Sequence, residues 1–289
     1  MFLPNIFVAR GDARHDTWKY IYDELVGNHD FNKDTKIIKD DEIKDLKDKN
    51  KNKKYFPTTS TQEIRTLCTQ TKETQRPNIF VENDIFLLPH TNESRYLIKG
   101  NGYFNFDQKE LENLESKKFP SELTSNFITN KIGSSEANAI DNAFNSGLLN
   151  KFYKLDKEEL FLTSRGRHYE SLKFEFDKYA LECDGIQFEP DAIYEGEKHI
   201  IILEAKTDNK FNNYIIRQLF FPYHIVKNQM DELIKKKEIQ KAKTIKCLFL
   251  FAQKTKKDED FTYTFIDIKF PDHKKMAYEI GEKRRFIIS

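Results

Sequence analysis

The chain has 289 residues, of which 38% are hydrophobic and 33% are charged, and its formal net charge is +1. This length fits one large domain or two modest domains, and the hydrophobic share supplies a core beneath a heavily charged surface. The balanced charge neither requires nor excludes a polyanionic partner, because a local basic face can bind DNA on a protein that is neutral overall.

Cysteine usage and the length of apolar runs exclude several classes of protein. Cys68, Cys183 and Cys247 are an odd number without paired spacing. Neither structural disulfides nor a cysteine zinc site is therefore expected, and a cytoplasmic location is favoured. The start, MFLPNIFVARGDARHD, lacks the basic segment and long apolar run of a secretory signal. The longest apolar runs, HIIILEA and IKCLFLFA, are too short to span a bilayer, so no membrane partner is expected.

The N-terminal part of the chain, residues 1–125, is expected to be a region of its own. Residues 33–54 are rich in Lys, Asp and Asn, which indicates a solvated helix that runs into a loop. The alternative is an arm whose basic residues 49–54 contact phosphates. Further along, the pattern predicts strands at 76–89 and 95–106, and a helix at 109–131 that is broken at Pro120.

Residues 126–289 alternate between helix and strand patterns. Ser134 or Ser135 can cap a helix whose apolar residues recur at helical spacing up to Leu148. After it we expect strands at 158–169, 172–196 and 198–207, a helix at 212–236 that Pro222 kinks or interrupts, and strands at 244–254 and 261–270. This order predicts an α/β (α+β) fold with one central mixed sheet flanked by helices.

The stretch FEPDAIYEGEKHIIILEAK, residues 188–206, carries the most chemical information. If its two halves pair through a turn at Glu195–Lys198, Asp191 and Glu204 fall together near the open end of the hairpin. Strand alternation places Glu204 and Lys206 on one face and Ala205 on the other. Two neighbouring carboxylates repel each other least when a divalent cation lies between them.

Oxygen ligands of this kind select Mg²⁺, for which Mn²⁺ can substitute. The ammonium of Lys206 would then lie beside a metal-bound water, where it can orient that water or stabilise charge that develops on a phosphate. Such a set suits the hydrolysis of a phosphodiester. The seven histidines show no HxH or HxxxH spacing, which argues against a histidine metal site, and no glycine-rich phosphate loop occurs.

Pro190-Asp191, followed by Glu204-Ala205-Lys206 after an apolar strand, resembles the signature of the PD-(D/E)XK nuclease superfamily. A helix and then a strand follow, as the core of that superfamily requires. The resemblance covers roughly the last half of the chain, with some likeness to type II restriction endonucleases. It implies a catalytic domain at 126–289 and a DNA-recognition region at 1–125.

The resemblance also implies roles for individual residues. The catalytic residues would be Asp191, Glu204, Lys206 and Gln218, and the metal site would comprise Asp191, Glu204, Ala205 and Glu136. Gln218 and Tyr223 are similar to a Gln/Tyr helix of some of these nucleases, although the spacing here is five instead of the usual four. A first-turn glutamate such as Glu136 is also ordinary helix electrostatics. Glu182, Asp184 and Glu189 are competing acids on the preceding strand.

The segment TSRGRHY places Arg165, Arg167 and His168 close together, with Gly166 allowing the backbone to approach a phosphate. These three residues, together with Arg217 and Tyr223, are the predicted DNA-binding residues. Residues 121–167 can alternatively be interpreted as two helices and a wing, which would be a winged-helix module.

Three functions remain open from the sequence. The first is a type II restriction endonuclease acting on double-stranded DNA, which implies a cognate DNA methyltransferase in the same system and, for double-strand cutting, a homodimer. The second is a repair or recombination nuclease that recognises DNA structure. The third is a DNA-binding regulator without enzymatic activity.

Overall fold

The computed structural model describes residues 10–50, 64–120, 135–155, 158–208, 210–254 and 261–288. They divide into two compact units. Unit 1 comprises Met1–Phe104, Glu182–Ile186 and Asn213–Ile215, and unit 2 comprises Asn105–Leu181, Gln187–Asn212 and Ile216–Ser289. The main division therefore falls between Phe104 and Asn105, before the functional boundary expected at 125/126. Residues 51–54, 121–131 and Ser134, for which the sequence made predictions, lie outside the described residues.

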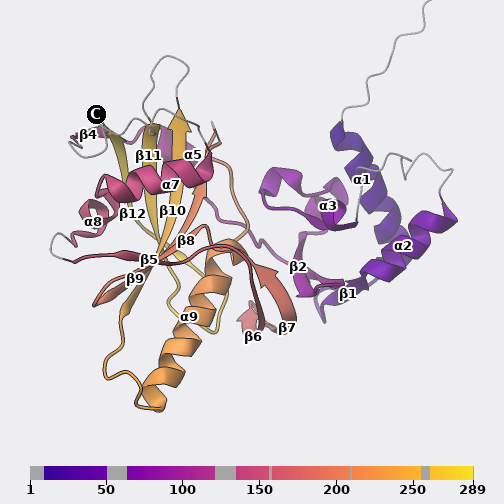
Figure 1. Ribbon diagram of the computed structural model, residues 1–289. Coiled ribbons are helices and arrows are strands. Elements are labelled where there is room, and N and C mark those ends of the chain that lie inside the picture. Colours follow the sequence, from indigo (N-terminus) through magenta and orange to yellow (C-terminus); the bar gives the residue numbers. More distant parts are fainter. Residues whose placement is uncertain are drawn as a thin grey trace, which may run out of the picture. The chain divides into compact units, whose positions relative to one another are not determined.

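Unit 1 is a small sheet covered by helices (Figure 1). Its elements are α1 (Arg10–Ile21), η1 (Tyr22–Val26), β1 (Lys36–Lys39), α2 (Asp40–Lys49), α3 (Ile64–Cys68), η2 (Glu73–Gln75), α4 (Asn78–Glu82), β2 (Ile85–Thr91) and β3 (Ser94–Lys99). The three strands are antiparallel, in the order β1-β3-β2. Trp18, Phe80 and Leu97 are buried together in its core.

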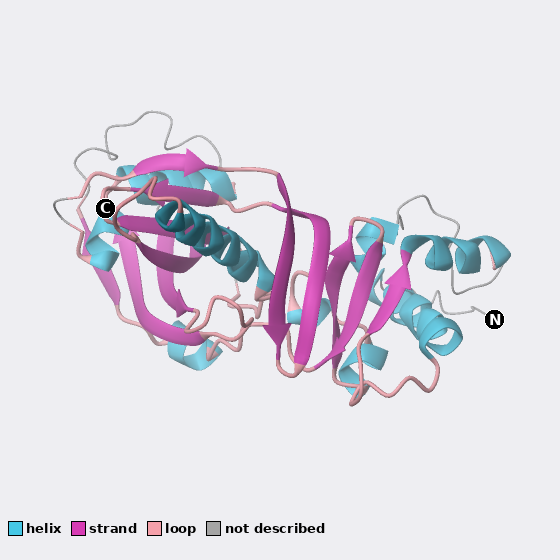
Figure 2. Ribbon diagram, turned by 90° about the horizontal axis from the view of Figure 1, so that it is seen from below, coloured by secondary structure: helices cyan, strands magenta, loops and turns pink. Residues whose placement is uncertain are grey.

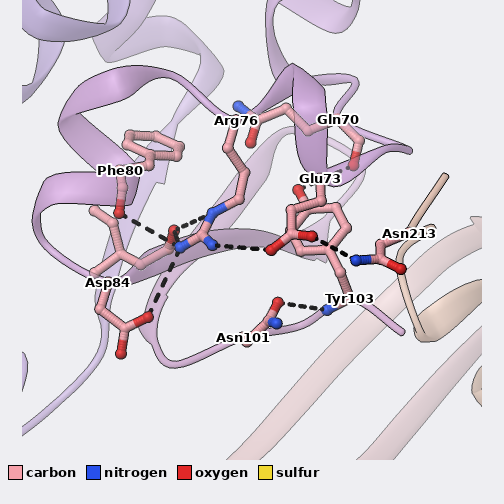
Figure 3. Close-up of polar contacts among 9 residues, drawn as sticks. Gln70, Glu73, Arg76, Phe80, Asp84, Asn101, Tyr103 and Asn213 are labelled. Atoms are coloured by element: carbon pink, nitrogen blue, oxygen red, sulfur yellow. Dashed lines mark hydrogen bonds and ion pairs between the residues drawn. The ribbon is translucent and has the colours of Figure 1, made fainter. Parts of the chain in front are cut away.

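A buried arginine fixes the segment that leads into β2 (Figure 3). The side chain of Arg76 is 6% exposed, and its Nη2 donates to the carbonyl of Ile85 at 2.8 Å. The carboxylates of Glu73 and Asp84 each lie 3.9 Å from the guanidinium. Glu73 in turn accepts a hydrogen bond of 2.8 Å from Asn213. The carbonyl of Ile85 satisfies donors that the burial of Arg76 would otherwise leave unpaired, so the cluster stabilises unit 1.

Two predictions for unit 1 need correction. Residues 76–89 were expected to be one strand, but the first part is helix α4, and the strand begins at Ile85. Pro77, the N-cap residue of α4, has no backbone N–H to donate to a sheet ladder, which disfavours a strand through this position. The solvated helix of residues 33–54 is confirmed as α2, but strand β1 precedes it because Lys36–Lys39 pairs with β3.

Unit 2 is built on a seven-stranded sheet. Its elements are α5 (Gln108–Glu112), β4 (Ser116–Phe119), α7 (Glu136–Asn145), α8 (Leu148–Tyr153), β5 (Phe161–Ser164), β6 (His168–Phe176), both ends of β7 (Tyr179–Phe188), β8 (Ala192–Glu195), β9 (His199–Lys206), α9 (Arg217–Lys235), β10 (Thr244–Lys254), β11 (Phe261–Lys269) and β12 (Glu279–Ile288). The strand order is β4-β12-β11-β10-β9-β8-β5, and β6 and β7 form a separate pair. β9–β10 and β12–β4 are parallel and the other neighbours are antiparallel, so the predicted α/β class with a mixed sheet is confirmed.

Helices cover both faces of this sheet. On one face, α7 and α8 bury Ile140 and Phe152 against sheet residues such as Leu203 and Ala205. The long helix α9 packs on β9 and β10 and is seen in front of the strands in Figure 2. The apolar run of β9 is thus enclosed on both sides, which explains its nearly unbroken hydrophobic sequence.

Three details of unit 2 concern the predicted elements. Ser135 caps α7 by accepting a hydrogen bond from the backbone of Asn138, as the sequence indicated. The segment before Pro120 is a short helix followed by strand β4, because residues 116–119 pair with β12. Pro222 does not interrupt α9, which continues from Arg217 to Lys235.

The turn of the β8–β9 hairpin is held by Glu158, a residue from outside the hairpin. Its Oε1 accepts backbone hydrogen bonds from Lys198 at 2.7 Å and from His199 at 3.0 Å, and its Oε2 lies 2.5 Å from Nδ1 of His199. Gly196 permits this approach, since a Cβ there would lie 2.4 Å from Oε1 of Glu158. The carboxylate therefore fixes one end of the strands whose other ends carry Asp191 and Glu204.

Replacing Glu158 with Ala should lower the melting temperature, because two backbone donors in the turn would lose their acceptor. The expected loss is about 1–3 kcal/mol of unfolding free energy. Thermal unfolding measures it, with Glu197→Ala, an exposed glutamate of the same turn, as the control. Equal melting temperatures for the two variants would show that Glu158 does not hold the hairpin.

Candidate active site

The register of the β8–β9 hairpin brings Asp191 and Glu204 together. Ala192 pairs with Leu203, and the antiparallel pairing continues to Glu195 and Ile200. Extending it outward by one residue sets Asp191 opposite Glu204 at the open end, as predicted. A hydrogen bond of 2.8 Å from the backbone N–H of Ala205 to Oδ2 of Asp191 fixes the aspartate there.

Lys206 lies at the centre of three carboxylates. Its Nζ is 2.6 Å from Oε1 of Glu204, 3.9 Å from Oδ2 of Asp191 and 3.9 Å from Oε2 of Glu136. Ala205 belongs to the core on the α7 side of the sheet, whereas Glu204 contacts α9. The predicted alternation of faces along Glu204-Ala205-Lys206 is therefore confirmed.

Two helices each contribute a residue of their first turn to this cluster. Gln218, the second residue of α9, donates from Nε2 to Oε1 of Glu204 at 2.7 Å. Glu136 is the first residue of α7, and its side chain is 42% exposed. The structure thus brings together five of the residues that the sequence singled out, from one hairpin and two helices.

Each of the two hairpin carboxylates uses one oxygen for donors from the protein and leaves the other oxygen for a ligand. Within the described residues, no donor contacts Oε2 of Glu204 or Oδ1 of Asp191. These two oxygens and the backbone carbonyl of Ala205, the residue after Glu204, form a hard donor set that fits Mg²⁺ or Mn²⁺. The described ranges contain no group of three or more His, Cys, Asp or Glu side chains arranged around a metal position. The fit therefore depends on the backbone carbonyl and on water, of which Mg²⁺ usually keeps several.

Burial governs the electrostatics of this cluster. Glu204 is 2% exposed, and burial raises the pKa of its carboxyl group to about 8, although Lys206 opposes the shift and Asp191 adds to it. Burial lowers the pKa of Lys206, but the carboxylates of Glu204, Asp191 and Glu136 outweigh this effect and leave the pKa raised. Burial likewise raises the pKa of Glu136. A divalent cation between these carboxylates would favour their ionised forms.

The predicted DNA-binding residues at 165–168 form a second cluster. Arg165 donates to Oδ1 of Asp141 at 2.7 Å, and Arg167 donates to Oε1 of Glu189 at 2.6 Å. Nε2 of His168 lies 2.9 Å from Oγ of Ser164. Glu189, which the sequence left as a competing acid near Asp191, is therefore the partner of Arg167.

The other two predicted DNA-binding residues lie on α9. Tyr223 donates its hydroxyl to the carbonyl of Phe270 at 3.1 Å and stacks on the ring of Phe270. This contact uses the tyrosine to attach α9 to the segment after β11. Arg217 precedes Gln218 and is partly buried. The roles of both residues in DNA binding stay predictions.

Sequence reasoning missed Asp141 and Glu158. Asp141 follows Glu136 on α7 by five residues, and only the fold shows that it meets Arg165. Glu158 precedes β5, and only the fold shows that it meets the hairpin turn. Neither residue belongs to a motif, so the sequence alone carries no signal for either contact.

The raised pKa of Glu204 predicts a pH-dependent difference in stability in EDTA. A carboxyl group with a raised pKa in the folded protein contributes stability that is fully present below its ordinary pKa of 4.5 and is lost as the pH rises through about 8. Glu204→Gln lacks this loss. Its melting temperature relative to wild type should therefore rise between pH 5 and pH 9.

The control is Glu197→Gln, which removes a negative charge from an exposed position on the same hairpin. A constant difference for Glu204→Gln over this range would mean that the buried carboxylate does not titrate as described.

All candidate site residues lie inside a region that a protein-family model matches. That family is described as a domain of unknown function, DUF6997, and the match spans residues 98–285. No curated protein and no solved structure matches the chain. No helix among the described residues is long and apolar enough to cross a membrane. The family match covers more than half of the sequence, so the chain belongs to the DUF6997 family.

Proposed function

We propose that this protein is a Mg²⁺-dependent endonuclease that hydrolyses phosphodiester bonds in double-stranded DNA, of the type II restriction class. One observation carries the proposal: Asp191, Glu204 and Lys206 converge at the open end of one hairpin, with Lys206 Nζ between the carboxylates. The order of α7, the β8–β9 hairpin, α9 and a parallel β10 supports it, since the PD-(D/E)XK signature requires a helix and a strand after the hairpin.

The residues of the site divide the chemistry between them. Asp191, Glu204 and the carbonyl of Ala205 would hold Mg²⁺, which when bound supplies positive charge to the phosphate and lowers the pKa of water. Gln218 orients Glu204 through the hydrogen bond from its Nε2. Lys206 has three donors and no acceptor, so it acts on the attacking water or on the phosphate and is not a metal ligand.

The reaction joins a water oxygen to phosphorus and breaks one P–O ester bond, and the proton lost from water balances the one taken up by the leaving oxygen. Negative charge accumulates on the phosphate oxygens on the way. The ammonium of Lys206 is already fixed by Glu204, so it can stabilise this charge without reorganising. Glu136 lies at the open side of the cluster and would act on the same cation through water.

The proposal extends to the rest of the chain. Residues 1–125 would recognise the DNA sequence, the protein would act in the cytoplasm, and a homodimer would cut both strands. A cognate methyltransferase would protect the host DNA. Plasmid DNA incubated with the protein and Mg²⁺ separates the classes of function: discrete bands indicate a restriction endonuclease, a smear or structure-dependent cutting indicates a repair nuclease, and intact DNA contradicts both.

Asp191→Asn and Glu204→Gln should each abolish divalent-dependent cleavage, because each removes an anionic ligand while preserving shape. Binding of duplex DNA in Ca²⁺ should remain within a few-fold of wild type. Agarose gels and fluorescence anisotropy measure the two properties, with Glu197→Gln as the control. Cleavage by either variant at a rate near that of wild type would mean that the metal ligands are wrongly assigned.

Lys206→Ala should lower the single-turnover cleavage rate at saturating Mg²⁺ by a factor on the order of 10²–10³, the usual effect of removing one preorganised donor from developing charge. Lys206→Arg should not restore the rate, because a planar fork does not replace a point charge in a tight site. If Lys206→Ala weakens DNA binding by the same factor as the rate, the lysine binds the ground-state phosphate instead.

A further inference from the structure

The loop that follows β5 runs toward the open end of the catalytic hairpin. β5 is antiparallel to β8, with Leu162 opposite Tyr194 and Ser164 opposite Ile193. Continuing in this direction, the loop from Ser164 to His168 passes the residues that precede β8, where Asp191 lies. The loop brings Arg167 to Glu189, two residues before Asp191, and Arg165 to Asp141, on the helix that begins at Glu136.

Gly166, between these arginines, leaves the backbone of the loop accessible. Its φ is +92°, which L side chains rarely adopt, and no atom lies within 4 Å of the position that a Cβ would occupy. Open space over a glycine allows a phosphate to approach the backbone closely. Ser164 and His168 join the two ends of the loop through their 2.9 Å contact, which keeps the turn narrow.

Both arginines are held by carboxylates from neighbouring elements. Asp141 on α7 binds Arg165, and Glu189, just before the hairpin, binds Arg167 and also accepts from Gln187 at 2.5 Å. In the pair of Arg167 and Glu189 the side chains are 63% and 44% exposed, and in the pair of Arg165 and Asp141 they are 34% and 50% exposed. Solvent-exposed ion pairs contribute only about 0–1 kcal/mol each, so a stronger anionic partner can replace the carboxylates.

We propose that Asp141 and Glu189 are stand-ins for DNA phosphates, and that Arg165 and Arg167 exchange these carboxylates for backbone phosphates of duplex DNA. A guanidinium donates to carboxylate and phosphate oxygens with the same geometry, so the exchange needs only side-chain rotation. The inference rests on the proposed function for its choice of DNA as the polyanion. It adds that Asp141 and Glu189 limit the affinity for duplex DNA, because they compete with the DNA backbone for the same arginine donors.

This exchange explains why basic residues next to a cleavage site are neutralised by acids. Unpaired arginines would bind any duplex through phosphates alone, because that contribution to affinity carries no sequence information. Competing acids weaken this non-specific binding and leave selection to contacts made elsewhere.

The test measures the affinity of the full chain for a fluorescein-labelled 30-base-pair duplex by anisotropy, in EDTA, between about 50 and 200 mM salt. Glu189→Gln should bind about two- to fivefold more tightly than wild type, the equivalent of up to ~1 kcal/mol, with an unchanged salt slope. Arg167→Gln should bind more weakly, and its salt slope should fall by about 0.9 for the phosphate contact it loses. Asp141→Asn should tighten binding as Glu189→Gln does. Arg165→Gln should weaken binding and lower the salt slope as Arg167→Gln does.

The double variant Arg167→Gln/Glu189→Gln separates the exchange from a general effect of charge. If Glu189 acts by occupying Arg167, the gain from Glu189→Gln disappears when Arg167 is absent. If the glutamate only repels DNA, the gain persists, and the inference is wrong. Glu282→Gln is the matched control, because Glu282 pairs with Arg284 on β12, five strands from β5, about 24 Å away at the usual strand spacing.

The outcome is independent of catalysis. If Glu189→Gln and Asp141→Asn bind DNA no more tightly than wild type while Mg²⁺-dependent cleavage is intact, the exchange is wrong and the proposed nuclease is unaffected. Failure of Asp191→Asn to abolish cleavage, with the arginine and acid effects present, would overturn the active site and leave the DNA-binding loop standing. A wild-type protein that binds no duplex at about 50 mM salt would overturn the exchange directly.

Discussion

The buried contact between Glu204 and Lys206 at the end of β9 is the constraint around which unit 2 is arranged. Removing a carboxylate from water is costly unless donors replace the lost hydration, and Glu204 is 2% exposed. Lys206 Nζ and Gln218 Nε2 both reach the same oxygen of Glu204, at 2.6 and 2.7 Å. The part of β9 between the hairpin turn and Glu204 is apolar and is enclosed by helices on both faces. The side chains of Glu204 and Lys206 therefore have little freedom to move.

The two helices around this contact both begin at it. α7 begins at Glu136 and α9 begins at Arg217, and the first turns of both helices reach the cluster at the open end of the hairpin. The positive ends of two helix dipoles thus face the carboxylates and partly offset their mutual repulsion. β9 and β10 are parallel and end side by side at the same edge, where Glu204 pairs with Phe249 in the register. In α/β sheets this carboxyl edge is where ligands usually bind.

The sequence predicts the parts of this arrangement that are local. Between Asp191 and Lys206 the sequence has turn residues and then an apolar strand, which predict the hairpin and its register. The alternation of side chains along a strand then predicts the faces of Glu204 and Ala205. Contacts between distant segments do not follow in this way. Strand β4 forms because residues 116–119 pair with β12, and Asp141 meets Arg165 because α7 crosses the sheet near β5. Neither contact can be predicted from the sequence of the two segments that form it.

In both charged clusters of unit 2, carboxylates of the protein bind the cations to which the proposed function assigns phosphate contacts. Lys206 is bound by Glu204, and Arg167 is bound by Glu189. The two differ in burial, since the side chain of Lys206 is 12% exposed and that of Arg167 is 63% exposed. A buried pair is costly to break because one charge is left without a partner, whereas an exposed pair exchanges readily with solvent and ions. Lys206 is therefore suited to remain fixed while a reaction proceeds beside it, and the arginines are suited to change partners when a polyanion arrives.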